Sequence, residues 1–456
     1  MSQMVELPLW LFVLIVLFAA VTFASHFLFP SVRWFFRRRL EKAVTKLNTR
    51  LTRPIEPFKL AHRYDMIQRL SYDPQVSEAI VEYARKERVP ENVAFEKARR
   101  YAREIVPSFS AFTYFGFGIR FARFLANTLY TVRTGPDNEK VIASVSPDAT
   151  VVFIMNHRSN MDYVLVTYLA ARASALSYAV GEWARIWPLS RLIKSMGAYF
   201  IRRRSRGALY RRVLSRYVHL ATEGGVTQAI FPEGGLSLDG RLAPPKMGLL
   251  TYVVEAGRAV GRDVVFIPVA INYDRVLEDR VLMAAHKRGD RRFGAKISVV
   301  LKFILEKLWL RMRGRFLRFG SAGVVFGDPI SMQAFGVDRR VEDLAETLMS
   351  RIQDVMPRMC VPVLAKGLLA TDEPQARQKV IDVAVQAIVA APESFLMGDD
   401  EDPKARVERA VAHMIQRGLI RPQGDLFEIP DQERDTLQYY ANSLDLPDAP
   451  ISAPAK

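Results

Sequence analysis

The chain has 456 residues, of which 50% are hydrophobic, a composition that excludes a disordered protein and suffices for about three domains. Its single cysteine, Cys360, excludes an intramolecular disulfide and a cysteine-based metal site, and its six histidines lie too far apart in sequence to suggest a zinc cluster. The net charge of +17 calls for an anionic partner, either nucleic acid or an anionic membrane face. We expect no metal ion and no bound cofactor.

The first predicted element is a transmembrane helix. Residues 7–29 form an apolar run without a formal charge, which at about 1.5 Å per residue can cross a bilayer core of roughly 30 Å. A cleaved signal peptide fits less well, because no Lys or Arg precedes the run. The run is followed directly by Arg33, Arg37, Arg38 and Arg39. By the positive-inside rule, we expect residues 1–39 to anchor the chain by a single pass through the cell inner membrane, with the rest in the cytoplasm and anionic lipids, not nucleic acid, as the partner.

Residues 40–139 are predicted as an accessory helical region interrupted by prolines. Its last part, residues 109–130, is crowded with phenylalanine and tyrosine and carries only Arg120 and Arg123 as charges. This composition is typical of a segment at a membrane surface. Packing of the aromatic residues against a core sheet would explain it equally well.

Residues 140–358 are predicted as an α/β domain, because short β-rich runs alternate there with helical segments. Strands are expected at residues 150–155, 177–180, 199–201, 227–231, 264–271 and 323–326, and helices at 161–172, 188–196, 208–222 and 246–260. Ligands of such sheets gather where strands end. His157, Arg202 and Glu233 all follow predicted strand ends.

The first of these strand ends opens into a polar cluster. The apolar run 151–155 is followed by the polar residues His157, Arg158, Ser159, Asn160 and Asp162. If His157 lies in the loop before the next helix, Asp162 can reach back to one imidazole nitrogen, fix the tautomer and leave the other nitrogen as a base. A helix-capping cluster, with Asn156 or Ser159 as the cap, accounts for the same residues without catalysis.

Two segments complete the predicted organisation. Residues 287–318 carry eleven Lys or Arg against two acids, with apolar residues at helical spacing. They fit a basic amphipathic helix on anionic lipid, or an insertion that packs on the sheet with its charges merely solvated. Residues 359–456 are predicted as a C-terminal helical region, with helices at 375–390 and 404–417 and a disordered tail after Pro447.

Four sequence blocks occur in a characteristic order. They are NHRSNMD at residues 156–162, GAYFIRR at 197–203, FPEGG at 231–235 and IPVA at 267–270. Together they resemble the glycerol-3-phosphate acyltransferase family, and within it the branch that acylates the sn-1 hydroxyl. The linking residues Leu209-Tyr210 and Pro245-Lys246-x-Gly248 also look like that branch, and LQYYAN at 437–442 is a fainter echo. The clear similarity covers residues 151–273.

The resemblance implies both a fold and a reaction. The fold is a glycerophosphate-acyltransferase-like sheet with flanking helices. The reaction transfers a fatty acyl group from acyl-CoA or acyl-acyl-carrier-protein to the sn-1 hydroxyl of glycerol 3-phosphate, giving lysophosphatidic acid by direct attack. His157 would be the general base, and Asp162 would hold its tautomer and stabilise the imidazolium.

A phosphorylated acceptor requires fixed positive charge, which arginine supplies as planar, paired donors. We predict substrate binding by Arg158, Ser159, Arg202, Arg203, Glu233, Gly234, Gly235, Ser237 and Lys246. Arg202 and Arg203 alternate along a strand and cannot both face one pocket; a solvated or lipid-facing charge run is the alternative for both. Glu233 could hold an arginine or a ligand hydroxyl, or could merely turn the chain.

The third block departs from the family pattern. The family continues from the glycine pair into arginine, serine and, in the sn-1 branch, a second arginine, whereas this chain has Leu236-Ser237-Leu238. The loss of one or two charge-assisted contacts would weaken acceptor binding by roughly a few kcal/mol unless Arg241 or Lys246 compensates. Dihydroxyacetone phosphate or a lysophospholipid therefore remains an alternative acceptor. A non-catalytic basic protein that binds anionic lipid would explain the charge, but not the pairing of His157 with Asp162.

Overall fold

The computed structural model describes residues 8–17, 44–49, 51–170, 174–181, 185, 189–202, 207–259, 261–289, 318–390 and 401–445. The chain divides into two compact units, Met1–Pro54 and Ile55–Lys456. In the first unit, residues 9–17 and 44–48 are helical. None of the helices among the described residues is long and apolar enough to span a bilayer. Most of the predicted span, residues 7–29, and the arginines that follow it lie outside the described residues.

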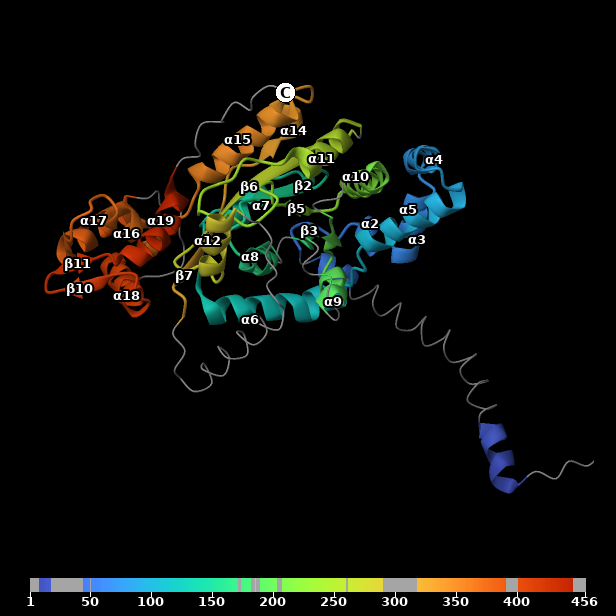
Figure 1. Ribbon diagram of the computed structural model, residues 1–456. Helices are drawn as coiled ribbons and strands as arrows, with labels where there is room; N and C mark the ends of the chain where they lie inside the picture. Colours follow the sequence, from blue (N-terminus) through green and yellow to red (C-terminus); the bar gives the residue numbers. More distant parts are fainter. Residues whose placement is uncertain are drawn as a thin grey trace, which may run out of the picture. The chain divides into compact units, whose positions relative to one another are not determined.

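The second unit is built on an eight-stranded sheet in the order β1-β7-β6-β2-β5-β3-β4, with β8 beside β6 (Figure 1). The strands are β1 (Thr131–Thr134), β2 (Thr150–Met155), β3 (Ser177–Val180), β4 (Tyr199–Phe200), β5 (Gln228–Ile230), β6 (Val264–Tyr273), β7 (Ser321–Phe326) and β8 (Ile330–Ser331). Strand β2 pairs in parallel with β5 and β6, whereas β7 and β8 run antiparallel to β6. The predicted α/β class and all six predicted strands are confirmed, while β1 and β8 were not expected.

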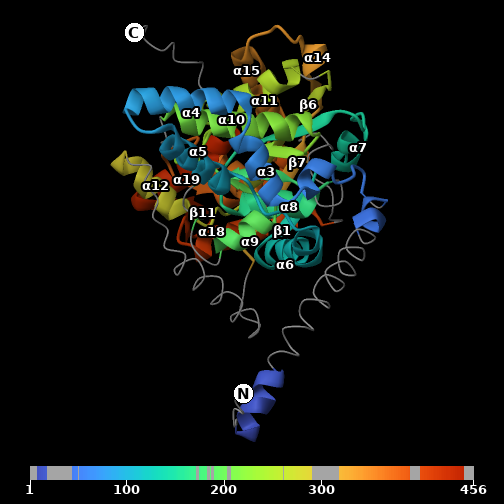
Figure 2. The ribbon, with the colours of Figure 1, turned by 90° about the vertical axis from the view of Figure 1, so that its right-hand side faces the viewer.

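Helices cover both faces of this sheet, so β2 and β6 are apolar and buried along their whole length. Alternate side chains of β2 enter two different hydrophobic clusters, with Val151 and Phe153 in one and Val152 and Ile154 in the other. Figure 2 shows α4, α10, α11 and α15 on one side of the sheet and α6 on the other. On the first side lie α3 (Arg63–Ser71), α4 (Pro74–Glu87), α5 (Glu91–Ile105), α10 (Ala208–Glu223), α11 (Met247–Ala259) and α15 (Val341–Asp354).

The opposite face carries α6 (Ile119–Leu129) and α8 (Met161–Ala170). A π-helix, η1 (Phe112–Gly118), leads into α6. Leu125 and Ala126 are buried in the core, whereas Phe117 and Phe121 are exposed. The aromatic segment therefore packs against the core along one side only. The shorter helices of this unit are α2 (Pro57–Leu60), α7 (Asn138–Ala143), α9 (Leu189–Ser195), α12 (Asp279–Arg288) and α14 (Met332–Phe335).

The C-terminal region packs on the same core as the sheet. It consists of α16 (Cys360–Leu368), α17 (Arg377–Val389), α18 (Pro403–Gln416), α19 (Arg434–Ala441), the 3-10 turns η4 (Asp431–Glu433) and η5 (Asn442–Leu444), and a small sheet of β9 (Gln375–Ala376), β10 (Arg421–Gln423) and β11 (Leu426–Glu428). Leu364 and Leu437 belong to the same buried cluster as Phe153. The predicted division at residues 39, 139 and 358 stays a prediction. The basic segment 287–318 lies almost entirely outside the described residues, as does the tail after Pro447.

Candidate active site

The loop between β2 and α8 is fixed from both ends. The Asn156 side chain donates to the carbonyl of Ile271 at 2.9 Å and accepts from its N–H at 2.7 Å, which ties the end of β2 to β6. Asn156 is therefore not the helix cap. Ser159 is placed for that role, because its Oγ accepts from the N–H of Met161 at 3.1 Å and its carbonyl accepts from the N–H of Asp162 at 3.0 Å.

His157 and Asp162 meet across this loop, both of them buried. The imidazole Nδ1 lies 2.9 Å from Asp162 Oδ2. The same oxygen accepts from the backbone N–H groups of Arg158 at 2.7 Å and Ser159 at 3.0 Å, and Oδ1 accepts from the Tyr273 hydroxyl at 2.5 Å. An ionised carboxyl group can only accept, so Nδ1 carries the proton and donates it. The capping geometry and the His–Asp pair thus coexist in one loop.

The other imidazole nitrogen is left available. No described residue forms a hydrogen bond with His157 Nε2. The ring packs against Phe231, with 4.2 Å between centroids, and edge-on against Tyr163 at 5.4 Å. Burial, together with the charge of Asp162, raises the pKa of Tyr273 well above its ordinary value, so its hydroxyl remains a donor. The arrangement presents one neutral nitrogen with the proton-accepting lone pair that a general base requires.

Glu233 joins the third block to the first. Its Oε1 accepts from the backbone N–H of His157 at 2.7 Å, and its Oε2 accepts from that of Ala243 at 2.9 Å. The N–H of Ser237 donates to the carbonyl of His157 at 2.8 Å. Burial raises the pKa of Glu233 to about 7, although both backbone bonds act in the opposite direction. Glu233 thus holds backbone rather than an arginine side chain, and so positions the loop that carries His157.

Arg158 is a buried cation beside this junction. Its guanidinium lies 5.8 Å from the ring centroid of Tyr439 on α19, and its Nε is buried without a hydrogen-bond acceptor among the described residues. Gly240 approaches the same place with φ of +91°, and a Cβ there would lie 1.9 Å from the carbonyl oxygen of Tyr439. Only glycine fits this approach. The structure thus brings Arg158, the third-block loop and the C-terminal helix together.

The other predicted substrate-binding residues are dispersed. Arg202 forms a bidentate ion pair with Glu104 of α5, at 2.8 and 2.7 Å, and lies 5.2 Å from the Tyr101 ring centroid. Arg185 binds the same carboxylate. Arg203 lies outside the described residues. The second block is therefore tied to α5 by an ion pair, and the predicted contact of Arg202 with phosphate stays a prediction.

Gly234, Gly235 and Ser237 shape the third-block turn. Gly234 has φ of +65°, and a Cβ there would lie 2.7 Å from Lys246 Cδ, so glycine lets the Lys246 side chain cross this turn. The backbone N–H of Lys246 donates to the carbonyl of Pro232 at 2.8 Å. The Ser237 hydroxyl donates to the carbonyl of Arg241 at 2.7 Å. Leu236 and Leu238, which stand in place of the family's arginines, pack against the hydrophobic core.

Four residues of the site were missed from the sequence, namely Asn156 as a tie to β6, Tyr273, Glu278 and Tyr439. Glu278 accepts from the Ser159 hydroxyl at 2.7 Å and from the Asn160 side chain at 3.0 Å. Ser159, predicted to bind substrate, is thus engaged with Glu278. The available signals were the position of Tyr273, three residues after the fourth block, and the faint family resemblance of LQYYAN, which contains Tyr439. Among the described residues, no group of three or more His, Cys, Asp or Glu side chains could hold a metal ion.

The fold and the site define an α/β domain with a polar site at the end of β2 and a C-terminal region packed against it. Residues 137–272 match the Acyltransferase family model, and residues 307–444 match that of the glycerol-3-phosphate acyltransferase C-terminal region. The chain is 28% identical over 416 residues to glycerol-3-phosphate acyltransferase of Aeromonas hydrophila, covering 85% of this chain and 50% of that protein. It is 28% identical over 429 residues to that of Pseudomonas syringae pv. tomato, covering 84% of this chain and 48% of that protein.

The predicted resemblance to the glycerol-3-phosphate acyltransferase family is thereby confirmed. The chain spans about half the length of the curated relatives it matches. Among solved structures, it is similar to the 1-acyl-sn-glycerophosphate (LPA) acyltransferase PlsC of Thermotoga maritima, with a TM-score of 0.33 and 17% identity over 56% of this chain and 80% of the other.

Proposed function

We propose that this chain transfers a fatty acyl group from acyl-CoA or acyl-acyl-carrier-protein to the sn-1 hydroxyl of glycerol 3-phosphate, giving lysophosphatidic acid. The observation that carries the proposal is the His157–Asp162 pair, with Nδ1 donating to the carboxylate and Nε2 left without a partner among the described residues. The named relatives supply the acceptor.

In the proposed reaction, Nε2 of His157 takes the hydroxyl proton as the acceptor oxygen attacks the thioester carbonyl. The carbon–sulfur bond then breaks, and the imidazolium returns the proton to the departing thiolate. Asp162 stabilises the transient imidazolium through Nδ1–H and keeps the ring in one tautomer. No covalent enzyme intermediate is needed.

The acceptor phosphate would bind to the cations nearest this junction. Arg158 is supported by its burial, by its lack of a counter-ion among the described residues and by its position beside the third-block loop. Arg241 and Lys246 belong to the same loop region, whereas Leu236 and Leu238 offer no charge. Because this departs from the family pattern, dihydroxyacetone phosphate and lysophospholipids remain the rival acceptors.

We also propose that the chain acts at the cytoplasmic face of the cell inner membrane, on a surface of anionic lipids. The apolar run at residues 7–29 and the arginines after it support this location. The exposed phenylalanines of η1 and α6, namely Phe112, Phe117, Phe121 and Phe124, support it independently.

The deciding experiment measures acceptor-dependent thiol release with glycerol 3-phosphate, dihydroxyacetone phosphate and a lysophospholipid. A general base commonly contributes about 10²–10⁴-fold, so His157→Ala should lose activity by at least that factor while remaining folded. His286→Ala, an exposed histidine on α12, is the matched control and should keep full activity. Full activity in His157→Ala would remove the mechanism, and release with a lysophospholipid alone would remove the acceptor. If no acceptor supports release, a lipid-binding role without catalysis gains favour.

A further inference from the structure

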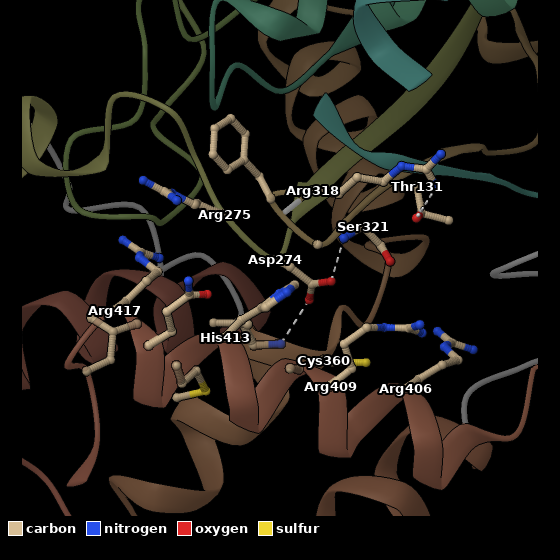
Figure 3. A pocket seen from close by; sticks show the side chains of 17 residues that line it. Thr131, Asp274, Arg275, Arg318, Ser321, Cys360, Arg406, Arg409, His413 and Arg417 are labelled. Carbon is tan, nitrogen blue, oxygen red and sulfur yellow. Dashed lines mark hydrogen bonds between the residues drawn. The ribbon is translucent and has the colours of Figure 1, made fainter. Parts of the chain in front are cut away.

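A cavity of about 520 Å³ lies between the sheet and helix α18, apart from the His157 site (Figure 3). Its wall is rich in arginine: Arg275 follows β6, Arg318 precedes β7, and α18 with its C-terminal cap provides Arg406, Arg409, His413 and Arg417. None of its lining residues belongs to the proposed catalytic or substrate-binding set.

The carboxylates near this cavity already have hydrogen-bond or ion-pair partners. Asp274 is the one carboxylate in the described lining, and its two oxygens accept from the backbone N–H groups of Ser321 at 2.7 Å and Val361 at 3.0 Å. Outside the lining, Glu401 forms an ion pair with Arg409, and Asp279 forms one with Arg417. These contacts neutralise two of the five arginines.

Three arginines are left without a carboxylate partner among the described residues, namely Arg275, Arg318 and Arg406. Arg275 lies 4.4 Å from the ring centroid of Phe319, and its Nε is buried without an acceptor. The Nη2 atom of Arg406 is also buried without an acceptor. Burial, followed by the neighbouring charge of Arg417, lowers the pKa of Arg275. The Arg275 Nε and Arg406 Nη2 atoms are shielded from water without an acceptor among the described residues, which is unfavourable unless a bound group, such as an anion, accepts from them.

Part of the remaining wall is apolar. Phe319, Val361, Met414 and Leu419 line the cavity beside the arginines. Phosphate matches the planar donor pairs of guanidinium, and a hydrophobic or ring-containing part of the same ligand would fit the apolar wall.

We propose that this cavity binds a phosphorylated ligand, whose negative groups are held by Arg275 on one side of the cavity and by Arg318 and Arg406 on the other (Figure 3). A free phosphate compound and the headgroup of an anionic phospholipid share this chemistry. The site does not depend on the reaction proposed for His157, since its test measures binding.

Calorimetric titration of the full chain in detergent separates the two sources. The probes are inorganic pyrophosphate, adenosine 3′,5′-bisphosphate and dihexanoyl phosphatidic acid, with dihexanoyl phosphatidylcholine as the uncharged comparison. Binding of either soluble phosphate identifies a free compound, and binding of phosphatidic acid alone identifies a headgroup. The result that overturns the proposal is that no phosphorylated probe binds, or that phosphatidylcholine binds equally well.

The double variant Arg318→Gln/Arg406→Gln should weaken probe binding at least tenfold. Its ligand-free unfolding temperature should stay the same or rise, because removing unpaired cations relieves repulsion. Arg351→Gln/Arg421→Gln removes two exposed arginines outside the cavity and should bind as the parent chain does. His157→Ala should also bind normally, because His157 does not line this cavity. Undiminished binding in the cavity variant, or a large drop in its ligand-free unfolding temperature, would show that these arginines are structural.

Discussion

Asp162 holds the candidate site together, because four donors from two segments of the chain converge on its two oxygens. Asparagine has a single acceptor oxygen, and its amide nitrogen would face a donor. We therefore expect Asp162→Asn to lower kcat at least about 100-fold by misplacing the His157 tautomer, and to lower the free energy of unfolding by about 1–3 kcal/mol.

Tyr273→Phe is the matched control for that change. It removes one donor from Oδ1 and leaves the bond from Nδ1 to Oδ2 in place. The activity loss should be much smaller than that of Asp162→Asn in steady-state assays. Equal losses of kcat in the two variants would mean that the hydroxyl, rather than the His157 tautomer, is what Asp162 controls.

Glu233 makes stability depend on pH in a defined direction. Burial raises the pKa of Glu233 in the folded chain to about 7, against an ordinary value of 4.5. The folded state thus binds this proton more tightly, and its contribution to the free energy of unfolding is present below about pH 4.5 and is lost as pH rises to about 7. At about 1.4 kcal/mol per pKa unit, the loss approaches about 3 kcal/mol.

Thermal or denaturant unfolding between pH 4.5 and 7.5 measures this effect against Glu233→Gln. Glutamine can accept only one of the two backbone N–H groups, so the variant should be less stable throughout. Its deficit should shrink as pH rises, since it lacks the titrating group. A deficit that grows with pH would contradict the raised pKa.

The sequence predicted the pair of His157 and Asp162 because both residues lie in one strand–loop–helix corner, where spacing alone limits the geometry. It could not predict Tyr273 or Glu278, whose contacts with this corner cross 111 and 119 residues of chain. Hydrophobic periodicity identifies strands and helices but carries no information on which strand end meets which polar loop. For the same reason, the sequence suggested a phosphate contact or a solvated or lipid-facing charge for Arg202, but not its ion pair with Glu104.

At the scale of elements, helix α19 completes the surroundings of Arg158. The Tyr439 ring lies against the guanidinium, and the Asn442 side chain, just after the helix, donates to the carbonyl of Asp239 at 2.8 Å. We expect Tyr439→Leu to raise the KM for the acceptor several-fold, because Arg158 loses the ring that positions it.

Tyr439→Phe tests this role without removing the ring. The Tyr439 hydroxyl is buried without a hydrogen-bond partner among the described residues, so its removal should leave KM unchanged and keep or raise the free energy of unfolding. If the phenylalanine variant raises KM as much as leucine does, the hydroxyl contacts the substrate and the positioning role is wrong.

Long, regular elements could be read from the sequence, and short ones could not. The predicted helix 208–222 is α10 (Ala208–Glu223), and the predicted strand 150–155 is β2. Strand β1 has only four residues, and strands β9 to β11 have two or three each. Such strands are too short for an alternation of apolar and polar residues to be recognised. Helix α19 was represented only by a faint resemblance in its LQYYA sequence, with no sign that it reaches the third block.

At the scale of the whole molecule, the C-terminal helices were predicted as a separate region without a catalytic signal. The structure places them on the face of the sheet that also holds Phe153, and their Tyr439 lies against Arg158. Sequence patterns locate apolar faces but not the partner that each face finds, so the shared core could not be foreseen.

Two physical forces would hold the second compact unit to a membrane, and they respond differently to salt. The chain is strongly basic, with a net charge of +17, and attraction to anionic lipid weakens as ionic strength rises. Phe117 and Phe121 are 52% and 43% exposed, and their ring centroids lie 5.6 Å apart. They would enter the lipid interface by apolar burial, which salt does not screen.

In a fragment beginning at Ile55, Phe117→Ser/Phe121→Ser should lower binding to phosphatidylglycerol vesicles at both low and high salt. The loss of binding free energy should be about 1.5–3 kcal/mol for each phenylalanine that is fully buried. The matched control is Val383→Ser/Val389→Ser, which changes two exposed valines of α17 (49% and 62% exposed). This variant should bind as the parent fragment does in a flotation assay. No loss of binding in the phenylalanine variant, or binding that high salt abolishes in the parent fragment, would show that charge alone makes the contact.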